Sequence, residues 1–337
     1  EALRDQNPAS DLNSYNTAVG HQAGLLVTTG VNNTLVGALS GDALTTGGTN
    51  TLVGAQAGTS LQGGSKNVAV GYKALKTEDG HGNNVAIGYQ ALESQNAGDD
   101  ALNIAIGYNA GNSVSTGILN TIIGGSAGES LTSGARNVLI GVRAGDALTD
   151  GNYNVAIGYQ ALTDDDQGDY NTAVGYFALE NFAGGDGHGY NTCFGAIAGR
   201  YISTGQYNVA VGSNTIGSGT TTGSYNTAVG HFAGYDLTSG SENVFIGSFA
   251  GDNISAGIRN VAIGYSALGA ENDHGLNVAI GHQALKNQDA GTNAYNVAVG
   301  YDAGLSVTTG TQNTIIGGLA GDALTSGANN VAVGYLA

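Results

Sequence analysis

Three histidines of this sequence stand in acidic segments, where imidazole and carboxylate groups together could bind a cation. The groups are Glu78 and Asp79 with His81, Asp186 with His188, and Glu271 and Asp273 with His274. Carboxylate oxygens are the usual ligands of hard cations such as calcium. No segment has EF-hand spacing, so solvated loops that keep a weakly charged protein soluble are the alternative interpretation.

A fourth acidic segment holds the densest group of carboxylates, Asp164, Asp165, Asp166 and Asp169, and Asp99 and Asp100 lie in a fifth. We expect no cofactor, with calcium in these acidic loops as the one alternative. The candidate binding residues, all in segments predicted to protrude, are Glu78, Asp79, His81, Asp99, Asp100, Asp164, Asp165, Asp166, Asp186, His188, Asp273 and His274.

Other constellations give little support for catalysis. Cys193 is the single cysteine, which excludes an intrachain disulfide, and we expect a packed thiol rather than a nucleophile. The Gly-x-Gly fragments lack the strand, loop and helix context of a nucleotide site. No carboxylate pair stands out as in a glycosidase. We therefore expect no enzyme, although a depolymerase with a site formed between chains stays open.

The composition restricts the classes of partner. The 337 residues include 59 glycines, only 10% are charged, and the formal net charge is −17. This charge disfavours nucleic acid and anionic lipid surfaces. No apolar run reaches the length of a membrane span, and no signal peptide is recognisable, so membrane insertion is not expected. Because the sequence begins at Glu1, we expect a processed or excised piece.

The elements that position these residues follow from a repeat. A block of Asn, then Thr, Val or Ile, then an apolar residue, then Val or Ile (Phe194 once), then Gly occurs nineteen times, mostly at a spacing of 17 residues. The copies begin at residues 16, 33, 50, 67, 84, 103, 120, 137, 154, 171, 191, 208, 226, 243, 260, 277, 296, 313 and 330. Such a unit is too short to fold alone, and its apolar run is strand-like. The sequence predicts an all-β fold, a parallel β-solenoid of about 19 coils.

Each position of the repeat carries an expectation. The first-position Asn predicts a buried amide ladder, and the fifth-position Gly a corner that a side chain would hinder. Side chains alternate along a strand, so the second and fourth positions share a face, which we expect to be the core. The third position should then point outward.

The third and sixth positions vary together. Eleven of the twelve copies with Ala at the third position have Tyr or His at the sixth, and the seven with a larger third residue have Ala, Gly, Ser or Val there. Two side chains that fill one space on an outward face would give this pattern. We interpret that face as an interface between copies of the chain, most simply in a homotrimer. The candidate interface residues are Tyr72, Tyr89, Tyr108, Tyr159, Tyr176, Tyr265 and Tyr301.

The ninth and twelfth positions divide the coils into two kinds. In eleven complete coils, called tight coils here, the ninth residue is Gly and the twelfth aliphatic. In seven others, called looped coils, the ninth is Leu or Ile, and all variation in coil length falls in them. One buried aliphatic group is thus supplied from either position. The segments that follow it, which we expect to loop outward, hold 14 of the 26 acidic residues.

These patterns predict one solenoid domain at residues 16–337, preceded by a cap or attachment segment at residues 1–15. Tight and looped coils alternate in five-coil groups at 16–102 and 103–190, a six-coil group at 191–295 and a partial group at 296–337. The last coil stops at Ala337, its eighth residue, and we expect something to cover the edge left there.

Pairs of hydroxyl residues before the closing Gly of tight coils, such as Thr28-Thr29 and Thr132-Ser133, suggest a second kind of surface. Stacked, they would form short ladders able to contact ice or a glycan. Hydroxyl residues before Gly are also ordinary turn formers, which is the competing interpretation.

The segments Asn84 to Leu92, Asn154 to Leu162 and Asn171 to Leu179 resemble the glycine-rich repeats of phage tail-fibre shafts and tail-fibre-domain proteins. More distantly, they are similar to the head repeats of trimeric autotransporter adhesins. The resemblance covers residues 16–337. It implies a trimeric β-solenoid at a virion or bacterial surface, outside the cell, that provides reach and attachment to a host glycan or protein receptor. The coils are 17 residues long rather than about 14 as in the adhesin heads.

Overall fold

The computed structural model describes residues 1–7, 13–185 and 187–337, and none of them lies in a helix. The chain forms two compact units, Glu1–Asp169 and Tyr170–Ala337. The strands of the first unit are β1 Thr17–Val19, β2 Thr34–Val36, β3 Thr51–Val53, β4 Val68–Val70, β5 Val85–Ile87, β6 Ile104–Ile106, β7 Thr121–Ile123, β8 Val138–Ile140 and β9 Val155–Ile157. Those of the second are β10 Thr172–Val174, β11 Thr192–Phe194, β12 Val209–Val211, β13 Thr227–Val229, β14 Val244–Ile246, β15 Val261–Ile263, β16 Val278–Ile280, β17 Val297–Val299, β18 Thr314–Ile316 and β19 Val331–Val333.

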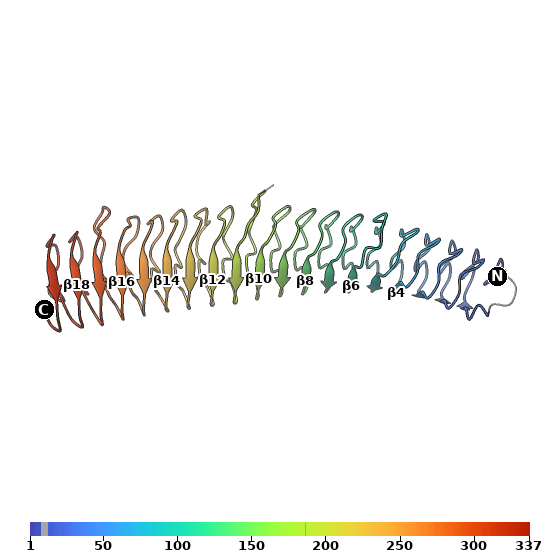
Figure 1. Ribbon diagram of the computed structural model, residues 1–337, viewed down its shortest axis with the longest axis horizontal. Coiled ribbons are helices and arrows are strands. Elements are labelled where there is room, and N and C mark those ends of the chain that lie inside the picture. The colour runs from blue at the N-terminus through green and yellow to red at the C-terminus, as the bar shows by residue number, and fades with distance from the viewer. Residues whose placement is uncertain (8–12, 186) are drawn as a thin grey trace. The chain divides into compact units, whose positions relative to one another are not determined.

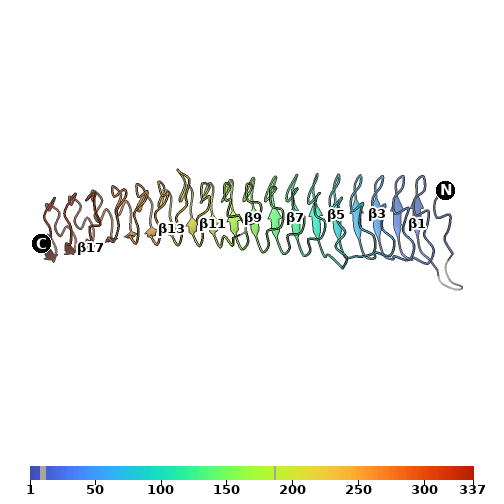
Figure 2. The same cartoon turned by 90° about the horizontal axis from the view of Figure 1, so that it is seen from above.

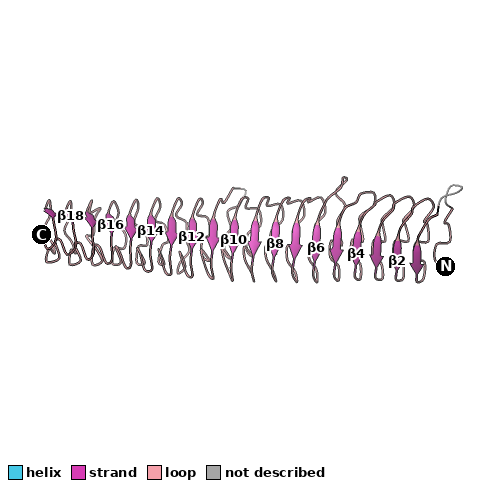
Figure 3. Cartoon of the chain, turned by 60° about the horizontal axis from the view of Figure 1, so that its bottom comes forward, coloured by secondary structure: helices cyan, strands magenta, loops and turns pink. Residues whose placement is uncertain are grey.

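Within each unit, every strand pairs in parallel with the next one along the chain (Figures 1 and 2). The register joins identical positions of successive repeats: Thr17 lies opposite Thr34, and Thr192 opposite Val209. Each strand has three residues, and the rest of its coil consists of turns and loops (Figure 3). The predicted all-β parallel solenoid with one strand per repeat is confirmed in both units.

The predicted facing of the strand was wrong. The third position is fully buried in all coils except the first and last, as at Leu35, Ala105 and Phe245. The second and fourth positions are half-buried or exposed in every strand, and Val19 is 60% exposed. Since both faces of the strand are apolar, alternation alone did not distinguish the inner from the outer face. The third position forms the core, and the second and fourth positions form the outer face, called the strand face below.

The predicted corner glycine is confirmed by its backbone. The fifth residue of every coil has φ between 128° and 144°, which L side chains rarely adopt. A Cβ added at Gly124 would lie 2.2 Å from the carbonyl oxygen of Gly141 in the next coil, and one at Gly88 would lie 2.0 Å from that of Gly107. Both the backbone angle and the distance between coils therefore require glycine.

The core explains why a large third residue is always accompanied by Gly at the ninth position. A Cβ at Gly58 would lie 2.8 Å from Cδ1 of Leu52, and one at Gly251 would lie 2.5 Å from Cδ1 of Phe245. Where the third residue is Ala and the ninth is Leu, as at Ala69 and Leu75, both are buried. The large third side chain fills the space that a ninth side chain would need.

The pairing of third and sixth positions in one outward space was therefore wrong. The third residue packs inside the coil, while the sixth lies outside, as buried Ala69 and exposed Tyr72 show. Among the described residues, third and sixth side chains thus lie on opposite sides of the coil wall, and their joint variation has no structural explanation.

The predicted asparagine ladder is present and buried. The backbone N–H of Asn50 donates to Oδ1 of Asn33 at 3.0 Å, and Nδ2 of Asn50 donates to the closing carbonyl of its own coil, Gly64 O, at 2.9 Å. The same pair of bonds recurs in the second unit, for example at Asn243 with Asn226 and Gly257. These bonds satisfy polar groups that would otherwise be costly to bury.

The ninth and twelfth positions also behave as predicted. Leu75 and Leu162, ninth residues of looped coils, are fully buried, and so are the twelfth residues Leu61 and Leu148 of tight coils. The twelfth residue of a looped coil is then free to be polar, and several such residues are nevertheless buried. These buried polar twelfth residues are Glu78, Gln95, Asp165, Glu271 and Gln288.

Residues 3–7 lie against the first coil. The backbone N–H groups of Leu3, Asp5 and Asn7 donate to the carbonyls of residues 23, 25 and 28. This segment therefore occupies part of the edge of the first coil.

Candidate functional site

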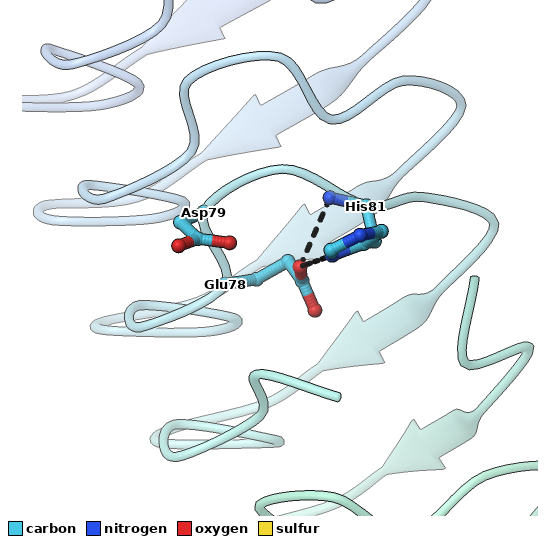
Figure 4. A group of neighbouring side chains, drawn as sticks. All are labelled: Glu78, Asp79 and His81. Carbon is cyan, nitrogen blue, oxygen red and sulfur yellow. Dashed lines mark hydrogen bonds and ion pairs between the residues drawn. The ribbon is translucent and has the colours of Figure 1, made fainter. Parts of the chain in front are cut away.

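A buried carboxylate and a histidine meet in the turn after β4. Glu78 is fully buried, and its Oε1 accepts a hydrogen bond from the backbone N–H of His81 at 3.1 Å and lies 3.5 Å from Nδ1 of the same residue (Figure 4). One ligand atom each from Glu78, Asp79 and His81 lies within 4.8 Å of the others. Glu78 Oε2 has no hydrogen-bond partner. We call these three residues the first cluster.

His81 occupies the closing position, where tight coils have Gly. A Cβ on such a glycine meets the closing carbonyl of the next coil, at 2.1 Å for Gly47 and 2.3 Å for Gly64. The coil after His81 is looped, and its residue at the corresponding position, Gly98, has no atom within 4 Å of an added Cβ. A side chain is therefore tolerated at position 81 because the following loop departs from the stack.

The second unit repeats this arrangement. Glu271, His274 and Asp289 bring one ligand atom each within 4.8 Å of the others, and we call them the second cluster. Glu271 is fully buried, neither of its carboxylate oxygens has a hydrogen-bond partner, and its Oε1 lies 3.6 Å from Nδ1 of His274. His274 again occupies the closing position before a looped coil. Here the third residue, Asp289, comes from that next coil.

Burial sets the electrostatics of both clusters. Burial raises the pKa of Glu78, an effect that His81 partly offsets. For Glu271, burial and then the nearby charge of Asp289 raise the pKa to about 7. In both clusters, burial thus makes the charged carboxylate less favourable than it is in water.

The structure brings together only some of the predicted binding residues. Glu78, Asp79 and His81 converge, whereas His274 converges with Glu271 and Asp289 and not with Asp273, which is exposed. The sequence pattern did not single out Asp289. Its signal is positional: Asp79 and Asp289 are both thirteenth residues of looped coils that lie next to a closing-position histidine.

The carboxylates of the fourth acidic segment, the alternative calcium site, form no group of three ligand atoms among the described residues. Asp164 and Asp166 are exposed, whereas Asp165 is buried and its Oδ1 accepts the N–H of Gly168 at 2.8 Å. Burial, followed by the charges of Asp166 and Asp169, raises the pKa of Asp165 to about 7. This carboxylate supports the turn of its loop.

The remaining loop candidates have other surroundings. Asp100 accepts hydrogen bonds from the N–H of Gly82 and from Nδ2 of Asn83, and Asp99 Oδ1 accepts the N–H of Asp100. The His188 ring lies edge-on to Tyr170 and Tyr190. Asp186 lies outside the described residues. These loops are thus partly ordered by their own polar contacts.

The seven tyrosines predicted for an interface lie on the surface, 40–59% exposed. In the first unit, the ring of Tyr89 stacks on those of Tyr72 and Tyr108, with centroid distances of 5.3 Å. In the second unit, His282 stacks between Tyr265 and Tyr301. Tyr159 and Tyr176 are exposed in the same way. The side chains predicted for an interface therefore form exposed aromatic rows.

A second aromatic row lies beside the asparagine ladder and was missed from the sequence. Tyr170, Tyr190, Tyr207 and Tyr225 stack in succession, with centroid distances of 4.9–5.0 Å. Each directly precedes the first-position Asn of a coil, and this regular spacing is the signal that could have revealed the row. The stacked rings cover one another's faces and leave their edges exposed.

The hydroxyl pairs are engaged within the solenoid. Thr28, Thr132 and Thr308 each donate through Oγ1 to a backbone carbonyl of the next coil, at 2.9–3.3 Å. These hydrogen bonds stabilise turns, but Thr132 and Thr308 are exposed nonetheless, as are second members such as Thr29 and Ser133. Cys193 is buried at a third position, where burial raises the pKa of its thiol well above the usual range. It packs in the core as predicted.

A surface hollow of the second unit adjoins the second cluster. It has a volume of about 510 Å³ and is lined by Ser218, Asp236, Asn253, Ser255, Ala270, Asn272 and Asp289. Because Asp289 is exposed there, the cluster can be reached from solvent. No helix long and apolar enough to cross a membrane occurs among the described residues.

No family model matches this chain, and comparisons with curated proteins and with solved structures find no match. The fold and the site therefore rest on the chain's own residues.

Proposed function

We propose that this chain is a structural and adhesive fibre segment, without catalysis, at a virion or bacterial surface. Its solenoid sets distance, and three copies pack together through their strand faces. Looped coils contact a host glycan or protein. The resemblance to tail-fibre repeats and the architecture of each unit support this proposal.

The observation that carries it is the apolar, uncharged strand face. Within each unit every fourth position is Val, Ile or Phe194, and every second is Val, Ile or Thr, with Thr in eight of the nineteen coils, so neither position carries a charge. Val19, Phe194 and Val333 are more than half exposed. A monomeric soluble protein rarely exposes a continuous apolar surface of this kind.

Another copy of the same chain is the partner that fits this face best. A second chain carries the same residues in the same strand-to-strand register, so apolar groups of one copy can meet apolar groups of the other. The flanking tyrosine rows add large aromatic groups of the kind enriched at interfaces. Acidic loops, which carry much of the −17 net charge, disfavour indiscriminate association.

Assembly is tested by measuring mass with light scattering. We expect about 100 kDa, three times the 33.4 kDa of one chain. Lysine at Ile106 and Ile123, fourth positions of adjacent coils, should reduce the mass to that of one chain. Ser133→Lys, at an exposed site away from the strands, is the control that should leave it unchanged. A wild-type monomer at micromolar concentration would contradict the proposal.

Attachment is tested separately, on a glycan array and on intact candidate host cells. We expect binding that is lost when Asp164 and Asp166, both exposed, are replaced by serine, while the mass stays the same. Release of reducing sugar from a capsule would instead support an enzyme. The ice- or glycan-binding hydroxyl ladder is not proposed, because its donors already bond to backbone carbonyls.

A further inference from the structure

We propose that the first cluster (Glu78, Asp79, His81) and the second cluster (Glu271, His274, Asp289) are two binding sites for a divalent transition metal of the zinc class. This inference concerns single chains and does not depend on the proposed fibre function. It rests on unsatisfied buried carboxylates, on their repetition in the two units, and on the chemistry of the donor atoms.

The buried carboxylates point to a missing partner. Glu78 and Glu271 are fully buried, and Glu78 Oε2 and both oxygens of Glu271 have no hydrogen-bond partner. Nδ1 of His81 and of His274 also has none, and each faces the buried carboxylate at 3.5–3.6 Å. Buried polar atoms without partners are costly, and a cation among these donors would satisfy carboxylate and imidazole together.

The neighbouring coils show how an uncharged residue at this position bonds within the solenoid, although Nε2 of Gln288 has no hydrogen-bond partner. Gln95 and Gln288, the twelfth residues of the following coils, accept hydrogen bonds through Oε1 from Nδ2 of Asn103 and Asn296, at 2.7 and 2.6 Å. An uncharged Gln therefore suits this place in the coil. A glutamate there is accompanied by a closing-position histidine in both units.

The two clusters consist of the same residue types, one Glu, one His and one Asp, but the Asp comes from a different coil in each. At the thirteenth position of two successive coils, the first cluster has Asp79 followed by Asn96, and the second has Asn272 followed by Asp289. In both cases one aspartate reaches the same Glu and His. A site with three ligands requires one such aspartate per cluster, whereas a solvated loop does not.

The donor set identifies the class of ion. One imidazole nitrogen with two carboxylates suits zinc and related divalent transition metals, whereas calcium prefers six to eight oxygen ligands. The histidine side chains are about one-third exposed, which leaves room for water as a further ligand. In the second cluster, an ion would also join two successive coils, because Asp289 belongs to the coil after Glu271.

The experiment uses the full chain, stripped with a chelator and titrated with zinc chloride by calorimetry, with metal analysis after gel filtration. We expect about two zinc ions per chain and a rise in melting temperature on binding. Glu78→Gln and Glu271→Gln should each lower the stoichiometry to about one, and the double variant should bind none. The substitution introduces the residue that the next coil already has at this position, so folding should be retained.

His81→Gly and His274→Gly are independent variants that restore the closing glycine of tight coils, and each should also remove one site. Asp165→Asn is the matched control, because it changes a buried twelfth-position acid that has no histidine, and it should leave zinc binding unchanged. Zinc binding that survives in the double glutamine variant, or uptake of calcium in preference to zinc, would overturn the proposal. If one of the single variants still binds two zinc ions, the cluster that it alters is not a zinc site.

Discussion

Tight and looped coils fill the same core in two ways. Tight coils place an aliphatic residue at the twelfth position and Gly at the ninth, whereas looped coils bury Leu or Ile at the ninth. Once the ninth residue fills the core, the twelfth need not be aliphatic: it is Glu, Gln or Asp in five of the seven looped coils, Gly219 in the sixth and the buried Phe182 in the seventh. The comparison shows that polar chemistry enters this solenoid where the packing requirement has been met from another position.

The largest expected effect tests the corner shared by both kinds of coil. Gly124→Ala should lower the free energy of unfolding by on the order of 5 kcal/mol, because its Cβ would lie 2.2 Å from a backbone oxygen at a φ of 141°. Chemical denaturation followed by circular dichroism measures this. The adjacent Gly125→Ala should be nearly neutral, since an added Cβ there meets nothing within 4 Å. Equal losses in the two variants would contradict the steric argument.

The next largest effect is a pH dependence of stability that comes from the twelfth position. Asp165 in a looped coil occupies the place that Leu148 has in the preceding tight coil. Burial raises the pKa of Asp165 to about 7 from 3.8. Below about pH 4 the carboxyl is protonated in both folded and unfolded states. As the pH rises from about 4 to 7, the unfolded state loses its proton first, so the free energy of unfolding falls.

Asp165→Asn removes this dependence and keeps an acceptor for the N–H of Gly168. Relative to wild type, the variant should gain stability across that pH range, by at most about 4 kcal/mol at pH 7, as measured by denaturation at several pH values. Asp164→Asn, at an exposed position, is the control. Parallel pH profiles for wild type and Asp165→Asn would show that this buried acid does not titrate as described.

The exchange between third and ninth positions can be tested with a double-mutant cycle. Gly58→Leu places a side chain against Leu52, and Leu52→Ala leaves a cavity, so each alone should destabilise. Together they recreate the Ala and Leu pair of looped coils, and we expect a favourable coupling of about 2 kcal/mol. Additive effects would mean that the two kinds of coil do not exchange core volume in this way.

The smallest effect concerns the hydroxyl ladders of tight coils. Thr132→Val removes the hydrogen bond from Oγ1 to the carbonyl of Thr149, and should cost about 1 kcal/mol in thermal or chemical denaturation. Ser133→Ala, at the exposed second member, should cost less. Strong shaping of ice crystals by the wild type, abolished by Thr132→Tyr, would show instead that the ladder faces a ligand.

Much of the fold could be predicted from the sequence because a repeat constrains the same position many times. The number of strands, the asparagine ladder, the corner glycine and the exchange of Gly for Leu at the ninth position all follow from periodicity, and the structure bears them out. A single copy of the repeat would have supported none of these inferences.

The inner face could not be predicted, because the strand is three residues long and apolar on both sides. Val and Ile at positions such as 68 and 70 suggested the core, while Ala69 between them looked less suited to it. The core of a narrow coil has room for Ala when a ninth-position Leu is present, so residue size misled the prediction. The second cluster was only half predicted, because Asp289 reaches it from the next coil across 15 residues of sequence.

The asparagine ladder has a consequence for how the length of such a protein can change. Oδ1 of the first-position Asn accepts the backbone N–H of the corresponding Asn in the coil that follows. This hydrogen bond is the same at every junction between coils within a unit. Duplication or loss of a 17-residue segment by recombination recreates the junction it interrupts. Length is then inherited as a whole number of coils, and a lineage can lengthen or shorten its solenoid without having to evolve a new core.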